Sequence, residues 1–349
     1  MPTYIHIDPS LTNIEVDTLV LNLVDRLVDA GEVAATMEAV ISDLDYVGIA
    51  TFDSDPLYDF RAQRPIATYA DGRLAEVSAP GMDLKLVTDV QGHTFLYISG
   101  QEPDFHWPVL AKDIVEIATH YNISHLYSFG GMPAPVPHTR PADMVVRSTQ
   151  PRDNEILHAY VEHYGTLADM VENEAAKRGL AATSIRTRVP GYLARGDHPF
   201  FSAALAVAKM LASLGGPVIP VGDLEQRVDE QMGFLAAAVE SNPELAELVA
   251  KLEADYDRLP EGVGFVRNGD PEIPTSDEIG EAVERFLEMR EEKPLEEAVK
   301  KSKAKNPPVR RGRHAWRAPT SGEEESSAEP GSAEPHTDAE PPASEGATE

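Results

Sequence analysis

A buried strand, an amphipathic helix and a second buried strand follow one another between residues 18 and 51. This order restricts the fold more than any other feature of the sequence. Residues 18–24 (TLVLNLV) and 46–51 (YVGIAT) are short apolar runs, typical of strands that are covered on both faces. Between them, Val33, Met37 and Val40 lie on one face of a predicted helix. Two strands joined by such a helix are expected to be parallel, with a right-handed crossover.

The following part of the chain continues this alternation. Residues 84–88 and 94–99 are predicted to be strands around a turn, and a helix over residues 106–121 leads to a strand that begins at residue 125. The same reasoning then predicts strands over residues 143–149 and 181–189, and helices over residues 155–178 and 198–214. The sequence therefore predicts an α/β fold, a three-layer α/β/α sandwich around a mostly parallel mixed sheet.

From residue 221 onward only helices are expected. Apolar residues recur at helical spacing on both sides of Asn242-Pro243, which predicts a helical hairpin that either packs on the core or presents a face to another chain. A loop is expected over residues 260–274 and a further helix from Thr275. Beyond about residue 291 the composition predicts disorder. The predicted organisation is a core domain over residues 1–220, a helical appendage over residues 221–290 and a disordered charged tail over residues 291–349.

Composition narrows the range of partners and locations. The formal net charge is −29, and residues 1–299 carry −28 of it, because a basic segment over residues 300–317 nearly balances the acidic end of the chain. A body this acidic repels polyphosphates, so we expect no nucleic-acid partner. The absence of cysteine excludes disulfides and thiolate metal sites. No apolar run reaches about 20 residues and no leader pattern occurs, so we expect a cytoplasmic protein that does not bind membranes.

The stretch over residues 124–141 (SHLYSFGGMPAPVPHTRP) is the main candidate for a functional site. It begins as a strand that Gly130-Gly131 is expected to end, and three prolines then stiffen the loop. His138, Thr139 and Arg140 follow, at the carboxyl end of the strand, where α/β proteins usually carry their sites. Arg140 can hold an anion with two parallel hydrogen bonds, and His138 can act as an acid or base.

Two other loops are expected at the same edge of the sheet, over residues 25–31 and 53–64. If the three loops converge, they form one cleft, in which the glycine amides and a second guanidinium, Arg64, also face an anion. Alternatively, the polar groups satisfy one another's hydrogen bonds and hold the loops in shape, as buried polar groups must. The candidate residues are Asp29, Asp53, Arg61, Arg64, Gly130, Gly131, His138, Thr139 and Arg140.

No complete catalytic or cofactor motif accompanies these residues. The sequence has no phosphate-binding loop of the Walker type, no GxGxxG, no HExxH and no GxSxG. Asp53 and Asp55 have two interpretations. They are half of a site for a hard cation, which needs several oxygen ligands, or they are two solvated carboxylates. We therefore predict no catalytic residue, no cofactor and no metal.

Several segments, in order, resemble the proteasome assembly chaperone 2 family in its long actinobacterial form. The central motif is GGMPAPVPHTRP, over residues 130–141. The resemblance covers about residues 15–290, and it implies an α/β sandwich similar to nucleoside phosphorylases. The other segments are VDAG (28–31), ATFD (50–53), YDFR (58–61), RP (64–65), SGQEPD (99–104), VPGYL (189–193) and DYD (255–257).

The resemblance also implies a function. Eukaryotic and archaeal members are non-catalytic chaperones that help proteasome α subunits form rings, and several dock through a C-terminal tripeptide with a central tyrosine. This chain departs from that pattern because it ends in Ala347-Thr348-Glu349. The first hypothesis is a non-enzymatic assembly chaperone or protein-interaction protein, acting as a homo-oligomer, with proteasome subunits among its candidate partners.

The second hypothesis belongs to a different class. It is a small-molecule enzyme on a phosphorylase/hydrolase-like scaffold, with an anionic or nucleoside-like substrate in the three-loop cleft. This hypothesis requires an open, concave site into which His138 and Arg140 point. Side chains that are enclosed and hydrogen-bonded within the protein would contradict it.

Overall fold

The computed structural model of the chain describes residues 2–5, 7, 14–25, 28–150, 163–194 and 198–258. The chain divides into two units, Met1–Glu292 and Lys293–Glu349, and the second lies wholly outside the described residues. The predicted loop over residues 260–274, the helix predicted from Thr275 and the predicted tail also lie outside them. The division into three domains therefore stays a prediction.

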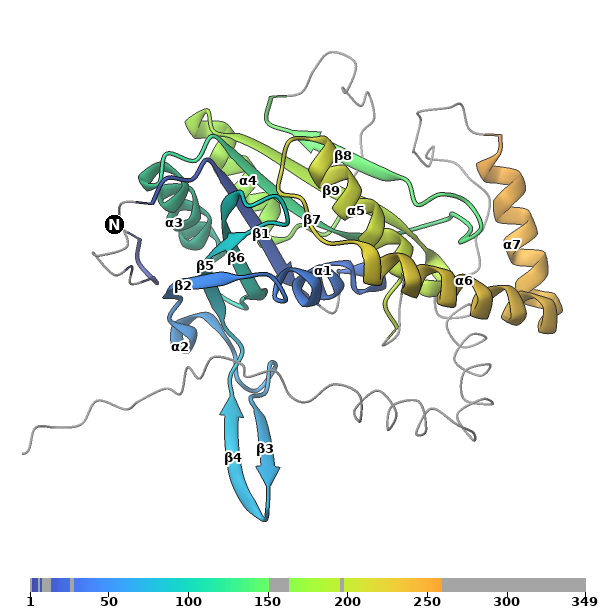
Figure 1. Cartoon of the computed structure of the whole chain (residues 1–349), viewed down its shortest axis with the longest axis horizontal. Helices are drawn as coiled ribbons and strands as arrows, with labels where there is room; N and C mark the ends of the chain where they lie inside the picture. The colour runs from blue at the N-terminus through green and yellow to red at the C-terminus, as the bar shows by residue number, and fades with distance from the viewer. Residues whose placement is uncertain are drawn as a thin grey trace, which may run out of the picture. The chain divides into compact units, whose positions relative to one another are not determined.

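A seven-stranded mixed sheet forms the middle layer of the described fold (Figure 1). Its strand order is β2-β5-β6-β1-β7-β9-β8. β1 is parallel to both of its neighbours, β6 and β7, and β7 is parallel to β9. Only β5 and β8 run in the opposite direction, so five of the seven strands share one direction. The strands are β1 (Thr18–Val24), β2 (Tyr46–Thr51), β5 (Met82–Thr88), β6 (Thr94–Gln101), β7 (His125–Ala134), β8 (Met144–Ser148) and β9 (Ala181–Pro190).

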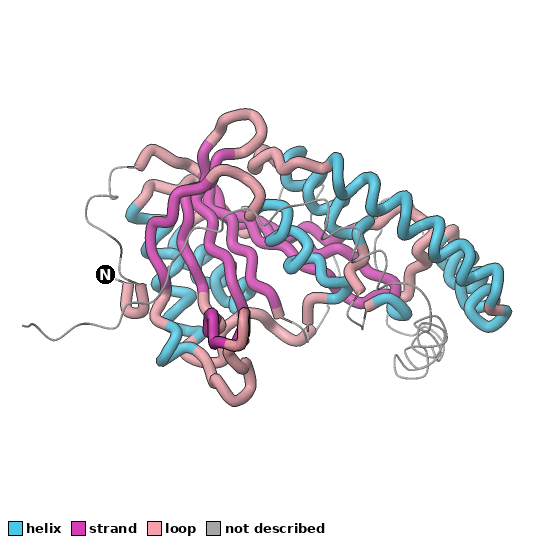
Figure 2. The backbone as a smooth tube through the Cα atoms, turned by 60° about the horizontal axis from the view of Figure 1, so that its bottom comes forward, coloured by secondary structure: helices cyan, strands magenta, loops and turns pink. Residues whose placement is uncertain are grey.

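Helices cover both faces of this sheet (Figure 2). α1 (Val33–Ile41) and α5 (Phe201–Ser213) pack on one face, and α3 (Trp107–His120) and α4 (Leu167–Arg178) pack on the other. Along β1, Leu19 and Leu21 are buried in the core on the α3 side, and Val20 is buried in the core on the α1 side. Burial on both faces explains why β1 is an almost unbroken apolar run. The predicted three-layer α/β/α sandwich is confirmed.

β2 differs from its prediction in position. The sequence indicated a strand buried on both faces and parallel to β1, but β2 is the edge strand, and β5 and β6 lie between it and β1. Its direction is that of β1, as expected for strands joined through α1. Tyr46 and Val47 are exposed, and Ile49 is buried. An apolar run therefore identified the strand without distinguishing an edge strand from a central one.

β7 is longer than predicted. Gly130-Gly131 were expected to end the strand, but β7 continues to Ala134 and pairs with β9 over its whole length. β1 pairs with β7 only as far as Ser128. The second half of β7 therefore has a sheet neighbour on one side only, and proline is tolerated in such a position because its missing N–H need not interrupt a ladder. Pro133 lies there, paired with Val189.

A separate two-stranded sheet projects from the larger one (Figure 1). β3 (Ile66–Ala70) and β4 (Arg73–Ser78) are antiparallel and are joined at Asp71-Gly72, where φ is 52° and 73°. Positive φ at both positions is typical of a type I′ hairpin turn. Every residue of both strands is exposed. Asp-Gly is a turn signal in the sequence, but the two strands beside it were not predicted.

The predicted helical hairpin is present and packs on the body. α6 (Gly222–Ser241) and α7 (Pro243–Tyr256) are separated by Asn242, whose side chain accepts hydrogen bonds from the first backbone N–H groups of α7. α6 contributes Leu224 to the core that α5 covers. α7 packs through Val249 and Leu252 against Tyr192, in a short turn that follows β9. No described helix is both long enough and apolar enough to cross a membrane.

Candidate functional site

The carboxyl ends of β1, β2, β6, β7 and β9 lie at one edge of the sheet, because these strands share one direction. The loops that were predicted to form one cleft do leave this edge. Their polar residues, however, form three separate groups in the structure. These groups are Asp29 with Gly130 and Gly131; His138, Thr139 and Arg140 beside α7; and the exposed residues Asp53, Arg61 and Arg64.

The Asp29 carboxylate ties the loop after β1 to β7. Its Oδ1 accepts a hydrogen bond from Gly131 N at 3.0 Å, and its Oδ2 accepts one from Ala34 N, in the first turn of α1, at 2.7 Å. Burial raises the pKa of Asp29 to about 6, although these hydrogen bonds and Arg186 oppose the shift. The glycine amide that was expected to bind an anion therefore binds a carboxylate of the chain itself.

Close packing requires glycine at position 131 and favours it at position 130. A Cβ on Gly131 would lie 1.9 Å from the carbonyl oxygen of Ala30. A Cβ on Gly130 would lie 2.5 Å from Nη1 of Arg186, whose side chain passes over this residue. Neither glycine has a positive φ. Space, rather than backbone conformation, is therefore the reason for glycine here.

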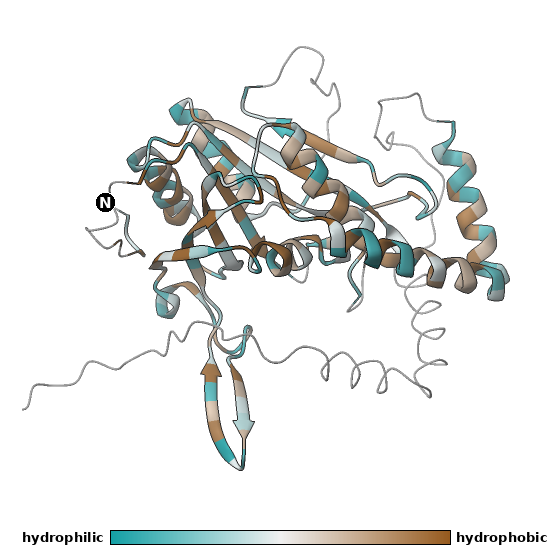
Figure 3. Ribbon diagram, viewed as in Figure 1, coloured by the Kyte–Doolittle hydropathy of each residue, from teal (hydrophilic) through white to brown (hydrophobic). Residues whose placement is uncertain are grey.

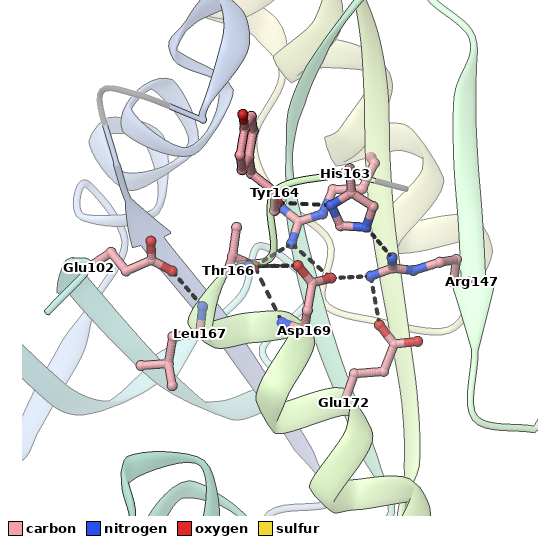
Figure 4. Close-up of polar contacts among 9 residues, drawn as sticks. Glu102, Arg147, His163, Tyr164, Thr166, Leu167, Asp169 and Glu172 are labelled. Atoms are coloured by element: carbon pink, nitrogen blue, oxygen red, sulfur yellow. Dashed lines mark hydrogen bonds and ion pairs between the residues drawn. The ribbon is translucent and has the colours of Figure 1, made fainter. Parts of the chain in front are cut away.

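A network of charged side chains surrounds the start of α4 (Figure 4). Thr166 and Asp169 form a capping box, in which each side chain accepts a hydrogen bond from the other residue's backbone N–H. Arg147, on β8, donates to Asp169 and, at 2.9 Å, to Oε2 of Glu172; its Nη1 lies 3.0 Å from Nε2 of His163. Burial alone would raise the pKa of Asp169, but the hydrogen bonds from Arg147 and Thr166 hold it below its usual value.

The capping box also corrects a helix boundary. The sequence predicted a helix over residues 155–178, but residues 163–166 are not helical and α4 begins at Leu167. Residues 151–162 lie outside the described residues. Thr166 followed three residues later by the acidic Asp169 is the local sequence signal for the start of α4.

Arg186, on β9, connects this network to Asp29. Its Nη2 donates to Oγ1 of Thr166 at 3.2 Å and lies 4.0 Å from Oδ1 of Asp169. Burial lowers the pKa of Arg186, while the carboxylates of Asp169 and Asp29 oppose that shift. One guanidinium therefore acts on a carboxylate in the loop after β1 and on another in the first turn of α4.

Glu102, in the loop after β6, is a second buried carboxylate at this edge, with 5% of the residue exposed. Its Oε1 accepts a hydrogen bond from Leu167 N, in the first turn of α4, at 2.7 Å. Burial raises the pKa of Glu102 to about 7, and the nearby carboxylates of Asp25 and Asp169 add to the shift. Sequence reasoning did not place Glu102, Arg147, Asp169 or Arg186 in the site. Only the SGQEPD segment of the family resemblance pointed to Glu102.

These groups surround a cavity of about 20 Å³. A space of this size holds about one water molecule, whereas pockets for small-molecule ligands usually measure about 300–1,000 Å³. Within the described ranges, no cluster of three side chains is arranged to hold a metal ion. The polar groups at this end of the sheet therefore mainly satisfy one another. The lining includes Asp25, Asp29, Glu102, Phe129, Thr166 and Arg186.

His138 is enclosed in the second group, with 5% of the residue exposed. Its backbone N–H donates to Oη of Tyr192 at 2.8 Å, and its Nδ1 lies 2.6 Å from the same oxygen. Burial lowers the pKa of His138, although the carboxylate of Glu253 opposes the shift. A neutral imidazole accepts a hydrogen bond at Nδ1 from the Tyr192 hydroxyl, so this hydroxyl and Nδ1 of His138 are each other's partners inside the protein.

Arg140 and Thr139 are paired with α7. Nε and Nη2 of Arg140 donate to the two carboxylate oxygens of Asp257 at 2.8 and 2.7 Å, and Nη1 donates to Glu253 at 3.1 Å. Thr139 donates to the same Glu253 carboxylate. The two parallel hydrogen bonds predicted for Arg140 therefore exist, but their acceptor is a carboxylate of this chain, just beyond α7.

The third group lies at the surface. Asp53 precedes the short helix α2 (Ser54–Leu57), and its backbone N–H donates to the carbonyl of Tyr4 at 2.8 Å. Asp53, Arg61 and Arg64 are all exposed. The structure therefore does not bring Arg64 to Arg140 to hold an anion between them.

Replacing Arg140 with alanine is expected to loosen α7 without unfolding the sheet. The change leaves Glu253 and Asp257 without their cation, while Val249 and Leu252 keep their apolar contact with Tyr192. Hydrogen–deuterium exchange should become faster across α7 and stay unchanged in β1 and β7. Arg140→Lys keeps the charge but loses the two parallel hydrogen bonds, so an intermediate effect is expected. Unchanged exchange in α7 in both variants would show that these ion pairs do not hold the helix.

Tyr192→Phe is expected to lower the free energy of unfolding by about 1–3 kcal/mol. It removes the oxygen that accepts from His138 N and leaves a buried N–H and a buried imidazole nitrogen without a partner. Urea denaturation at neutral pH measures the loss. Tyr164→Phe is the matched control, because Tyr164 is 90% exposed and its hydroxyl can remain hydrated. Equal stabilities for the two variants would contradict a structural role for the Tyr192 hydroxyl.

Comparison with known proteins identifies the family. The model of the PAC2 family matches residues 23–237, more than half of the chain. A comparison with curated proteins finds no match.

Solved structures with the same fold include the following three. A Corynebacterium glutamicum protein of unknown function is 22% identical, with a TM-score of 0.66 over 73% of this chain and 97% of its own. A Mycobacterium tuberculosis protein of unknown function is 25% identical, with a TM-score of 0.66 over 74% of this chain and 90% of its own. A proteasome-assembly chaperone homologue from M. tuberculosis is 21% identical, with a TM-score of 0.59 over 66% of this chain and 99% of its own. From the sequence match, which the fold supports, the chain belongs to the PAC2 family.

Proposed function

We propose that this protein is a non-enzymatic assembly chaperone or protein-interaction protein, that it acts as a homo-oligomer, and that proteasome subunits are among its partners. Membership of the PAC2 family supports a chaperone-like role. So does the description of one structural relative as a proteasome-assembly chaperone homologue. We also propose a cytoplasmic location, in keeping with a composition that contains no cysteine.

The observation that carries this proposal is a group of exposed apolar side chains on the β3–β4 hairpin. Ile66, Tyr69, Leu74 and Val77 all project from the β3–β4 hairpin and are at least 55% exposed. A group of large apolar side chains in water marks an interaction surface more often than a neutral part of a monomer. The carboxyl edge of the sheet, by contrast, offers charged groups that are already paired around space for about one water molecule.

The alternative, a small-molecule enzyme on a phosphorylase/hydrolase-like scaffold, is favoured by one observation. Asp29 and Glu102 both have raised pKa values and line the same cavity, and such groups are concentrated at functional sites. An enzyme would have to open this cavity far beyond its present size to admit a substrate. Thermal-shift screening of nucleosides and phosphorylated metabolites tests it: a stabilising ligand that loses its effect in Glu102→Gln would favour the enzyme.

Affinity capture tests the proposed function. The tagged full-length chain is recovered from lysate of its own cells, with the untagged strain as the background control, and co-purifying proteins are identified by mass spectrometry. Enrichment of proteasome α subunits over the control is the expected result. Recovery of the chain with no proteasome subunit above background would contradict the proteasome link.

A further inference from the structure

α7 is packed on the body more loosely than another helix of the same length. Of its 14 residues only Val249 and Leu252 are buried, whereas seven of the 14 residues of α3 are buried. Along α7, hydrophilic residues alternate with a few apolar ones (Figure 3). Burial of an apolar face provides most of what holds a helix on a fold. The attachment of α7 therefore depends on its polar contacts more than that of α3 does.

The ion pairs that connect α7 with the loop after β7 are partly open to water. The side chain of Arg140 is 29% exposed, that of Glu253 31% and that of Asp257 55%. Ion pairs at such positions contribute little to stability, and salt weakens them. Arg140 nevertheless donates three hydrogen bonds to the two carboxylates, so this one side chain joins the end of α7 to the loop.

α6 and α7 meet at a single non-helical residue, Asn242 (Figure 1). Its backbone is extended, with φ −125° and ψ 104°, and the next residue, Pro243, has no N–H that could bond back to α6. α6 itself is fixed to the body, because Gln231 accepts a hydrogen bond from Phe201 N at 3.1 Å and donates one to the carbonyl of Pro199 at 2.7 Å. Rotation about Asn242 therefore moves α7 and leaves α6 in place.

We propose that α7 is a strap that swings away from the body about Asn242, and that Arg140 is the latch that holds it closed. In the closed form, Val249 and Leu252 pack against Tyr192. Opening uncovers these apolar side chains and frees the guanidinium of Arg140 from the carboxylates of α7. The donor groups that the sequence suggested for an anion become available in the open form. The movement does not depend on which partner the protein binds.

The distance between two spin labels measures the opening, and the chain suits this experiment because it has no cysteine of its own. The full-length chain is labelled at Lys251→Cys, an exposed position of α7, and at Ser213→Cys, at the exposed end of α5. Two distances are expected, one for closed and one for open chains. The ratio of open to closed chains should rise about three- to tenfold between about 0.05 M and about 1 M sodium chloride, because salt screens exposed ion pairs. A single distance at both salt concentrations would overturn the proposal.

Variants of the labelled chain test the latch. Arg140→Ala should raise the ratio of open to closed chains about tenfold at low salt and make this ratio insensitive to salt, with Arg140→Lys between this variant and wild type. Lys209→Ala is the matched control. It also removes one positive charge and one exposed ion pair, with Glu225 at 2.9 Å, but that pair joins α5 to α6. Equal opening in Lys209→Ala and Arg140→Ala would indicate a general effect of charge and overturn the proposal.

Hydrogen–deuterium exchange at the two salt concentrations distinguishes opening of the strap from unfolding. In the unlabelled wild-type chain, high salt should make exchange faster in α7 and in the loop after β7, and leave it unchanged in α6, β1 and β7. Exchange that becomes faster throughout α6 or the sheet to the same degree as in α7 would mean that the chain unfolds as a whole. That result would overturn the proposal even if two label distances were found.

Discussion

Gly131→Ala is expected to destabilise the protein by about 3 kcal/mol or more, the upper range for overpacking a core. The new Cβ would lie 1.9 Å from the carbonyl oxygen of Ala30, which belongs to the backbone and cannot rotate away as a side chain can. Relief of this clash requires β7 and the turn after β1 to separate. That movement also breaks the hydrogen bond from Gly131 N to Asp29.

Urea denaturation measures the effect, and Gly233→Ala is the matched control. Gly233 lies inside α6, and a Cβ there meets nothing within 4 Å. Alanine at this position should stabilise the protein by up to about 1 kcal/mol, because glycine is the poorer helix former. A Gly131→Ala variant as stable as wild type would show that β7 and this turn do not lie as close as the structure has them.

Glu102→Gln is expected to stabilise the protein by about 3 kcal/mol at pH 8 and to have little effect near pH 4. In the folded protein Glu102 keeps its proton up to about pH 7. In the unfolded chain, where burial is lost, its pKa returns to the usual value of 4.5. The folded state therefore binds more protons than the unfolded chain between these values, and its stability falls as the pH rises through them. Glutamine carries no charge, and its Oε1 can still accept the hydrogen bond from Leu167 N.

Unfolding free energies of wild type and variant across pH 4–8 check this expectation. The difference between the two should grow steadily from about pH 4.5 to pH 7 and then level off. Glu76→Gln, on the exposed β4 strand, is the control and should leave the wild-type profile unchanged. A Glu102→Gln variant that is less stable than wild type at pH 8 would mean that the charged carboxylate is favourably held in the folded protein.

Much of the fold could be predicted because burial on both faces leaves a clear pattern in the sequence. β1 is apolar at most of its buried positions, and the helices between strands have one apolar side. β2 shows the limit of this reasoning. The sequence YVGIAT is typical of a central strand, yet Tyr46 and Val47 are exposed. The prediction fails here because an apolar run does not reveal which neighbours a strand has.

The candidate site was only partly predictable. Asp29 and Gly131 could be placed together because the loop after β1 and the carboxyl half of the parallel strand β7 lie at the same edge of the sheet. Arg186 could not, because no local sequence pattern indicates that its side chain contacts Thr166 and Asp169. The carboxylates that bind Arg140 are 113 and 117 residues away in the chain, at Glu253 and Asp257. Such pairs depend on the tertiary fold and have no local signature.

The arrangement around Arg140 changes how its motif is interpreted. An arginine and a histidine at the carboxyl end of a strand suggest a ligand site, but here both are engaged by the rest of the chain. His138 is fixed by Tyr192 and Arg140 by acidic residues at the end of α7. The GGMPAPVPHTRP segment therefore connects β7 to the helical hairpin, and the surfaces available to partners lie elsewhere.

We infer that this protein works through its surface and not through the cavity at the carboxyl edge of the sheet. The most direct measurement is the recovery of proteasome α subunits by tagged wild type and by tagged Glu102→Gln, both over an untagged control. Equal enrichment by the two chains is the expected result, because the variant keeps the fold and changes only the cavity. Enrichment by wild type that is lost in Glu102→Gln, or no enrichment by either chain, would contradict the claim.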